Sequence, residues 1–64
     1  MTDLTLTPGE DGVLAAAMDE ALRLRLSDDR TIEHVATAIL GEITSDYTTA
    51  WRLASRELDR RFSH

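Results

Sequence analysis

A chain of 64 residues forms one domain at most, and a domain of this size buries a smaller fraction of its surface than a larger one does. It has no cysteine, which excludes a disulfide framework and a cysteine-ligated zinc site. Its 12 acidic and 7 basic residues give a net charge of -5, which repels phosphate backbones and disfavours nucleic acid as a partner.

The first residues, 1–6, are predicted to form an extended arm. Leu4-Thr5-Leu6 alternates like a strand but has no partner strand, so Leu4 and Leu6 are expected to pack onto the core or a neighbour. The start of the chain lacks the basic and apolar regions of a secretion signal, and no stretch approaches the roughly 20 apolar residues of a membrane span. We therefore expect a soluble, cytoplasmic protein with no membrane contact. Its basic residues are all arginine, and this usage, with no Lys, Asn or Gln, is typical of a GC-rich bacterial genome.

The start of the first helix is predicted from Thr7-Pro8-Gly9-Glu10, which has the pattern of a capping box. Thr7 can accept a hydrogen bond from the Glu10 backbone, the Glu10 carboxylate can reach back to the Thr7 N–H, and Pro8 occupies a position where no donor is needed. The pattern predicts a helix from Pro8 to Leu24 or Arg25. Its apolar residues recur at three- and four-residue steps and are expected to face a core: Val13, Leu14, Ala17, Met18, Ala21, Leu22 and Leu24.

A second helix is predicted after a break at Ser27-Asp28-Asp29-Arg30. Thr31 is the expected N-cap, with Asp29 as the alternative. The β-branched residues that follow could indicate a strand, but their three-and-four spacing and the lack of strict alternation favour a helix. One face of this helix carries Ile32, Val35, Ala36, Ile39, Leu40 and Ile43.

The third helix is predicted from about Asp46 to Phe62, after Gly41 and the capping sequence Thr44-Ser45-Asp46. Its predicted apolar stripe holds Tyr47, Ala50, Trp51, Ala54, Leu58 and Phe62. Trp51 is expected to anchor either the core or a dimer interface. The late arginines are interpreted as complements of the helix dipole tied to Glu57 and Asp59, or as a docking patch for an acidic partner.

These patterns predict an all-α protein, a compact bundle of three to four helices. Residues 7–62 are expected to form a single helical domain, and residues 63–64 a disordered tail. Since neither a disulfide nor a metal can reinforce so short a chain, self-association is the expected support.

The first two helical patterns resemble a repeat of the N-terminal domain of the Clp AAA+ unfoldases. The resemblance covers about residues 6 to 43. It rests on Leu6-Thr7, then Val13, Ala17, Ala21 and Leu24, and then Glu33-His34 before the apolar run from Val35 to Leu40. The usual Gly-Thr-Glu-His step reads Thr31-Ile32-Glu33-His34 here, and the loop before it is one residue longer.

The resemblance implies a protein-interaction module, because the Clp domain docks adaptors and substrates and in some members binds phosphorylated arginine. Glu33 would pair with a guanidinium, with Thr31 and His34 beside it, and backbone donors at the helix start would receive an anion. The Clp domain has two such repeats, so one repeat implies half a domain completed by a homodimer. The expected interface residues are Trp51, Tyr47, Leu58 and Phe62, with the Val13/Ala17 stripe as the alternative.

No catalytic or metal-binding pattern is evident in the sequence. The serines lack a positioned base, and neither histidine has a second histidine or a cysteine three or four residues away, so we expect no enzymatic activity, metal or cofactor. The expected function is binding of protein substrates, adaptors or modified peptides. The alternative is a structural or regulatory helical homodimer, such as an accessory subunit or a small DNA-binding regulator.

Overall fold

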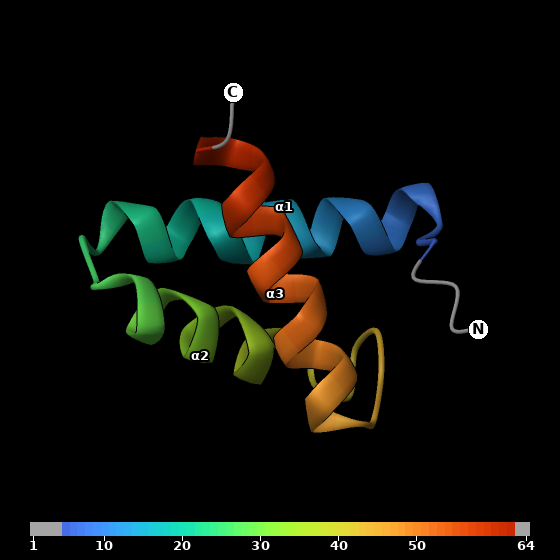
Figure 1. The fold of residues 1–64 in the computed structure, drawn as a ribbon. Coiled ribbons are helices and arrows are strands. Elements are labelled where there is room, and N and C mark those ends of the chain that lie inside the picture. Colours follow the sequence, from blue (N-terminus) through green and yellow to red (C-terminus); the bar gives the residue numbers. More distant parts are fainter. Residues whose placement is uncertain (1–4, 63–64) are drawn as a thin grey trace.

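The computed structural model describes residues 5–62 and contains three helices, α1 (Pro8–Arg23), α2 (Asp28–Ile39) and α3 (Tyr47–Phe62). α1 and α2 run in opposite directions, and α3 crosses them so that each helix packs on the other two (Figure 1). Within residues 5–62 the only strand-like pairing is an isolated bridge between Leu40 and Thr44. The all-α prediction is confirmed, with three helices.

The predicted N-terminal arm is described only at Thr5 and Leu6, where the backbone has no regular structure. Leu6 is half-buried and packs against the core. The prediction for Leu4 and the tail predicted for 63–64 lie outside the described residues. None of the helices in the described part of the chain has the length and hydropathy to cross a membrane.

α1 begins as its capping box predicts. The Thr7 hydroxyl accepts a hydrogen bond from the Glu10 N–H at 3.2 Å, and the Glu10 carboxylate accepts one from the Thr7 N–H at 3.0 Å. The helix ends at Arg23 with Leu24 as its C-cap, just before the predicted end at Leu24 or Arg25. Arg25 has φ 57°, the left-handed conformation that closes many helices, so it lies outside the helix.

α2 begins three residues before the predicted cap, so the prediction that Thr31 is the N-cap was wrong. Ser27 occupies the N-cap, and Asp28 and Asp29 lie in the first turn, where their charge suits the helix dipole. Thr31 is one turn inside the helix: its N–H donates to the Ser27 carbonyl at 2.8 Å and its hydroxyl donates to the Leu26 carbonyl at 3.3 Å. With its hydroxyl satisfied, this side chain is buried at 1% exposure.

The connection from α2 to α3 is a tight loop. Gly41 adopts φ 88°, a conformation that suits glycine, and its N–H donates to the Thr44 carbonyl at 2.8 Å. The Asp46 carboxylate accepts hydrogen bonds from the Thr49 hydroxyl at 2.6 Å and the Thr49 N–H at 3.1 Å, which lower the pKa of Asp46. The cap predicted within Thr44-Ser45-Asp46 is confirmed, and Asp46 is the residue that provides it.

The core lies between the three helices and is built from aliphatic side chains and alanine. It consists of Leu14, Met18, Ala21, Val35, Ala36, Ile39, Ala50, Leu53, Ala54 and Leu58. Val13 and Leu24, predicted to face it, are 40% and 54% exposed. Leu40, predicted on the apolar face of the second helix, is 38% exposed as the C-cap of α2.

The buried side of α3 differs from the predicted stripe. Ala50, Ala54 and Leu58 are buried as expected, but Leu53 and Glu57 complete the inner face in place of the aromatic residues. Small alanines let α3 approach the other helices closely, and Leu53 fills the space that remains. α3 is therefore rotated about its axis relative to the prediction.

A charged cluster joins the end of α3 to α1. Glu57, 4% exposed, accepts hydrogen bonds from Arg60 at 2.7 and 3.1 Å and from Arg61 at 2.8 Å. Arg61 also pairs with Asp19 and donates to the Ala15 carbonyl at 3.4 Å, both on α1. Burial opposes ionisation of Glu57, but the hydrogen bonds from the two arginines outweigh it and lower the pKa of this carboxyl.

Candidate functional site

The most distinctive surface of this protein lies on α3, where all three aromatic residues of the chain sit outside the core. Tyr47, Trp51 and Phe62 are 43%, 36% and 62% exposed, and Leu58, 9% exposed, joins their row to the core. We call Tyr47, Trp51, Leu58 and Phe62 the aromatic face. At 100° per residue, its members fall within about 60° around the helix, so they form one stripe along α3.

The two ends of the aromatic face differ: one carries a pair of contacting rings and the other borders a hollow. At the start of α3 the Tyr47 and Trp51 rings contact each other with centroids 6.1 Å apart at a tilt of 47°. At the far end, a hollow of about 500 Å³ opens between α2 and α3 and is lined by Asp28, Ile32, Ser55, Leu58, Asp59 and Phe62. Its lining combines apolar side chains with two carboxylates.

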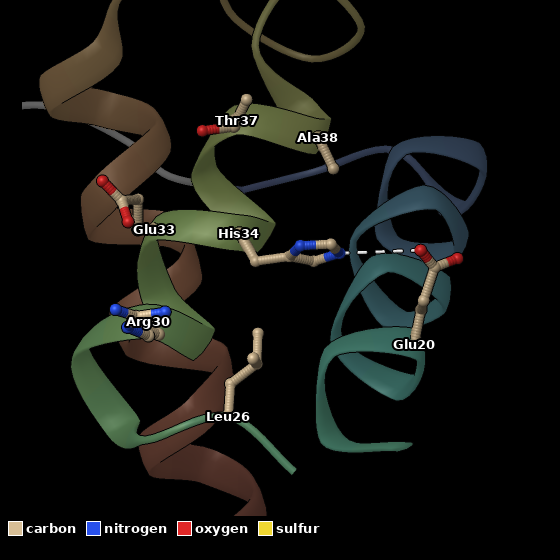
Figure 2. Close-up of a pocket in the computed structure, with 7 residues that line it drawn as sticks. All are labelled: Glu20, Leu26, Arg30, Glu33, His34, Thr37 and Ala38. Carbon is tan, nitrogen blue, oxygen red and sulfur yellow. Dashed lines mark ion pairs between the residues drawn. The ribbon is translucent and has the colours of Figure 1, made fainter. Parts of the chain in front are cut away.

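A second hollow lies between α1 and α2 (Figure 2). It is lined by Glu20, Leu26, Arg30, Glu33, His34, Thr37 and Ala38 and has a volume of about 470 Å³. His34 points from α2 toward α1, where its Nε2 lies 3.6 Å from Oε2 of Glu20. Side chains of both charge signs therefore line this hollow together with the apolar Leu26 and Ala38.

The predicted ligand residues are only partly brought together. Glu33 and His34 both line the α1/α2 hollow, but Figure 2 shows them pointing in different directions, as neighbouring positions on a helix must. Thr31 is not in the hollow lining, because it is buried against the Leu26 carbonyl. Glu33 is the sixth residue of α2, so the free N–H groups of the first turn are not beside it. The helix-start donors that were expected to receive an anion therefore lie away from Glu33.

The predicted interface residues do share one surface. Tyr47, Trp51 and Phe62 are exposed side chains of one stripe, and Leu58 borders it. Of the two roles predicted for Trp51, the core anchor is contradicted by its 36% exposure. The other predicted surface, Val13 and Ala17, has one exposed and one half-buried member on α1.

Several residues of these surfaces were not identified from the sequence as site residues. Asp28 and Asp59 border the hollow of the aromatic face, and Glu20 and Arg30 border the other one. The sequence shows only that each of these charged residues lies about one helical turn from an apolar residue, which does not distinguish it from other surface charges. Groups of three or more His, Asp or Glu side chains placed to hold a metal ion do not occur within residues 5–62.

Comparisons with protein-family models, with curated proteins and with solved structures found no match to this chain.

Proposed function

We propose that this chain is a non-enzymatic protein-interaction module and that the aromatic face of α3 is its docking surface. The observation that carries the proposal is the placement of the aromatic residues. All three are at least a third exposed on one stripe, while aliphatic residues and alanine fill the core. Aromatic side chains are enriched in the buried centres of protein interfaces, and contiguous exposed apolar patches mark such interfaces.

The proposal includes the resemblance to one Clp N-domain repeat. It is supported by the residues that carry that resemblance and by the capping box that starts α1 at Thr7. In that interpretation the chain is half of a two-repeat domain, completed by dimerisation. A missing second half would leave one side of the bundle uncovered, and an apolar stripe on α3 is the kind of surface that it would cover.

The charges of α3 favour a protein over a nucleic acid as the partner. Arg60 and Arg61 are engaged by Glu57, and Arg61 is further engaged by Asp19. Two carboxylates, Asp28 and Asp59, border the hollow of the aromatic face. A phosphate backbone laid along this side of the molecule would be repelled by these carboxylates and by the net charge of -5.

Photocrosslinking in cells that produce the protein tests the docking surface. A photoreactive phenylalanine analogue at position 62 should give adducts of defined mass. The matched control carries the analogue at Val13, an exposed apolar position on α1 that lies off the aromatic face. Equal adduct formation from both positions, or none from position 62, contradicts the proposal.

A second candidate function is recognition of an arginine side chain of a partner peptide at the α1/α2 hollow. The supporting observation is that Glu20 and Glu33 contribute carboxylates to its lining and Arg30 contributes a cation that could meet a phosphate. Glu33→Arg should abolish binding of an arginine-phosphorylated peptide. Glu42→Arg, an equal charge change at an exposed loop residue, should leave it unchanged. Equal binding by both variants removes Glu33 from this role.

A further inference from the structure

We propose that the partner of the aromatic face is a second copy of this chain, docked with the two α3 helices antiparallel around a two-fold axis near Ala54 and Ser55. The inference rests on the proposed function, because it names the occupant of the same surface. It is argued from the shape of the face, the positions of its residues along α3 and the charges beside it.

The shape of the aromatic face is self-complementary. One end presents the Tyr47 and Trp51 rings, and the other end presents the hollow whose apolar lining is Ile32, Leu58 and Phe62. The centres of the two ends are about 11 residues apart, or about 16 Å along the helix at 1.5 Å per residue. A two-fold axis between them carries the rings of each copy into the hollow of the other, so the same contact forms twice and the assembly closes as a dimer.

The positions along α3 fit this symmetry. Tyr47 and Phe62 are equally far from the midpoint between Ala54 and Ser55, and so are Trp51 and Leu58. In the antiparallel arrangement, Tyr47 therefore faces Phe62 of the partner subunit, and Trp51 faces Leu58 of the partner subunit. The side chains nearest the axis are small, which allows the two helices to approach closely.

The charges next to the aromatic face also match across the two-fold axis. Arg52 and Asp59 are two turns apart on the same flank of α3, where both side chains are exposed. Equivalent flanks of antiparallel helices face each other, so Arg52 lies near Asp59 of the partner subunit, and the pair occurs twice. In a parallel two-fold arrangement the equivalent flanks lie on opposite sides of the interface, so this pair would not form.

The extent of the aromatic face indicates a small interface. The stripe from Tyr47 to Phe62 is about 22 Å long. A standard interface of about 800 Å² per partner would take less than a fifth of the 4477 Å² surface of this chain. A face of this length lies at the small end of specific interfaces, so we expect micromolar affinity, and the measurement must extend into the millimolar range.

Molar mass measured by light scattering during size-exclusion chromatography tests the partner. The wild type should change from monomer to dimer across the concentration series. Tyr47→Ser should remain monomeric at concentrations at which the wild type is dimeric, with unchanged helix content. Val13→Ser removes a similarly exposed apolar side chain from α1 and should dimerise like the wild type. Equal weakening by both variants overturns the proposed surface.

Single cysteines test the register, since the chain has none of its own. Ser55→Cys lies beside the axis and should form a disulfide-linked dimer under mild oxidation. Thr48→Cys should not, because the two copies of this residue are about 20 Å apart along the antiparallel helices. Linkage through Thr48→Cys in preference to Ser55→Cys overturns the antiparallel register.

A charge exchange provides an independent test. Arg52→Glu and Asp59→Arg should each weaken the dimer at low salt, and the double variant should restore it. Failure of the double variant to recover contradicts the pairing across the axis.

The outcomes separate this inference from the proposed function. A wild type that is monomeric throughout the millimolar range overturns the second copy as partner. The proposed function then stands or falls on whether position 62 crosslinks to a different protein. Assemblies that grow beyond the dimer show head-to-tail docking of the rings into the hollow and overturn the two-fold axis.

Discussion

Arg61→Ala should destabilise the protein much more than Arg60→Ala, although both arginines bind the same carboxylate. Arg60 donates to Glu57 at 2.7 and 3.1 Å, within α3, and its side chain is 66% exposed. Arg61 donates to Glu57 at 2.8 Å, is 24% exposed, and extends to Asp19 and the Ala15 carbonyl on α1. Arg60 therefore makes an ion pair within one helix, whereas Arg61 connects two helices. Comparing the two variants measures the difference.

The magnitudes follow from exposure. Loss of Arg60 leaves Glu57 paired with Arg61, and an exposed pair contributes about 0–1 kcal/mol. Loss of Arg61 leaves a carboxylate that is 4% exposed with one fewer charged donor, and a hydrogen bond to a charged group contributes about 1.5–3 kcal/mol. We expect a loss of about 2 kcal/mol, out of a total of about 3–10 kcal/mol for a domain of this length. The Tm should fall by about 10 °C.

Urea unfolding followed by circular dichroism and Trp51 fluorescence measures both variants at one protein concentration, so that self-association contributes equally. Arg61→Lys is the control, because it keeps the charge but loses the guanidinium fork, and its stability should be intermediate. A cost for Arg60→Ala equal to or above that of Arg61→Ala would refute the assignment of Arg61 as the link between α3 and α1.

Three further predictions concern local features. Thr7→Ala removes the capping box of α1 and should lower the free energy of unfolding by about 1 kcal/mol in urea titration, and an unchanged midpoint contradicts the role of the cap. Arg25 and Gly41 both have positive φ, which glycine adopts more easily than other residues. Arg25→Gly should therefore raise the free energy of unfolding by about 1 kcal/mol, and Gly41→Ala should lower it by about 1 kcal/mol, with Tm changing in the same directions. Changes of the same sign in both variants would contradict this cause. The pKa of Glu57 is lowered in the folded state, so its stabilisation is present above the unfolded value of 4.5 and is lost as pH falls through the folded pKa. Glu57→Gln should therefore flatten the loss of stability measured between about pH 5 and pH 3, and parallel pH profiles would contradict it.

The helix starts show which features the sequence determines locally. The cap at Thr7 and the cap within Thr44-Ser45-Asp46 were predicted correctly because each acts on an N–H three residues away. The start of α2 was predicted incorrectly because Ser27, Asp28, Asp29 and Thr31 are all capable of capping a helix. Burial of Thr31 against the core decides between them, and burial depends on the other helices.

The face of α3 required tertiary information. Periodicity placed the aromatic residues on one stripe with Ala50 and Ala54, but in the structure Leu53 joins these alanines beneath α3 and the aromatic residues do not. Pairing of the late arginines with Glu57 and Asp59 was one of two interpretations of the sequence, and the structure shows it for Glu57, which lies three and four positions from Arg60 and Arg61. Its extension to Asp19 was not predictable, since Arg61 and Asp19 are 42 residues apart in sequence.

The exposed aromatic face has a consequence for how stability and assembly are related. Full burial of a large apolar side chain stabilises a fold by about 1.5–3 kcal/mol. Tyr47, Trp51 and Phe62 are partly exposed, so each contributes only a part of this free energy. A larger protein could tolerate the loss, but in 64 residues it is comparable to the whole free energy of unfolding. The surface that best supports a partner is therefore also the surface whose coverage would stabilise the monomer fold most. Docking at this face would raise the stability of α3 itself, and with it the Arg61 link to α1.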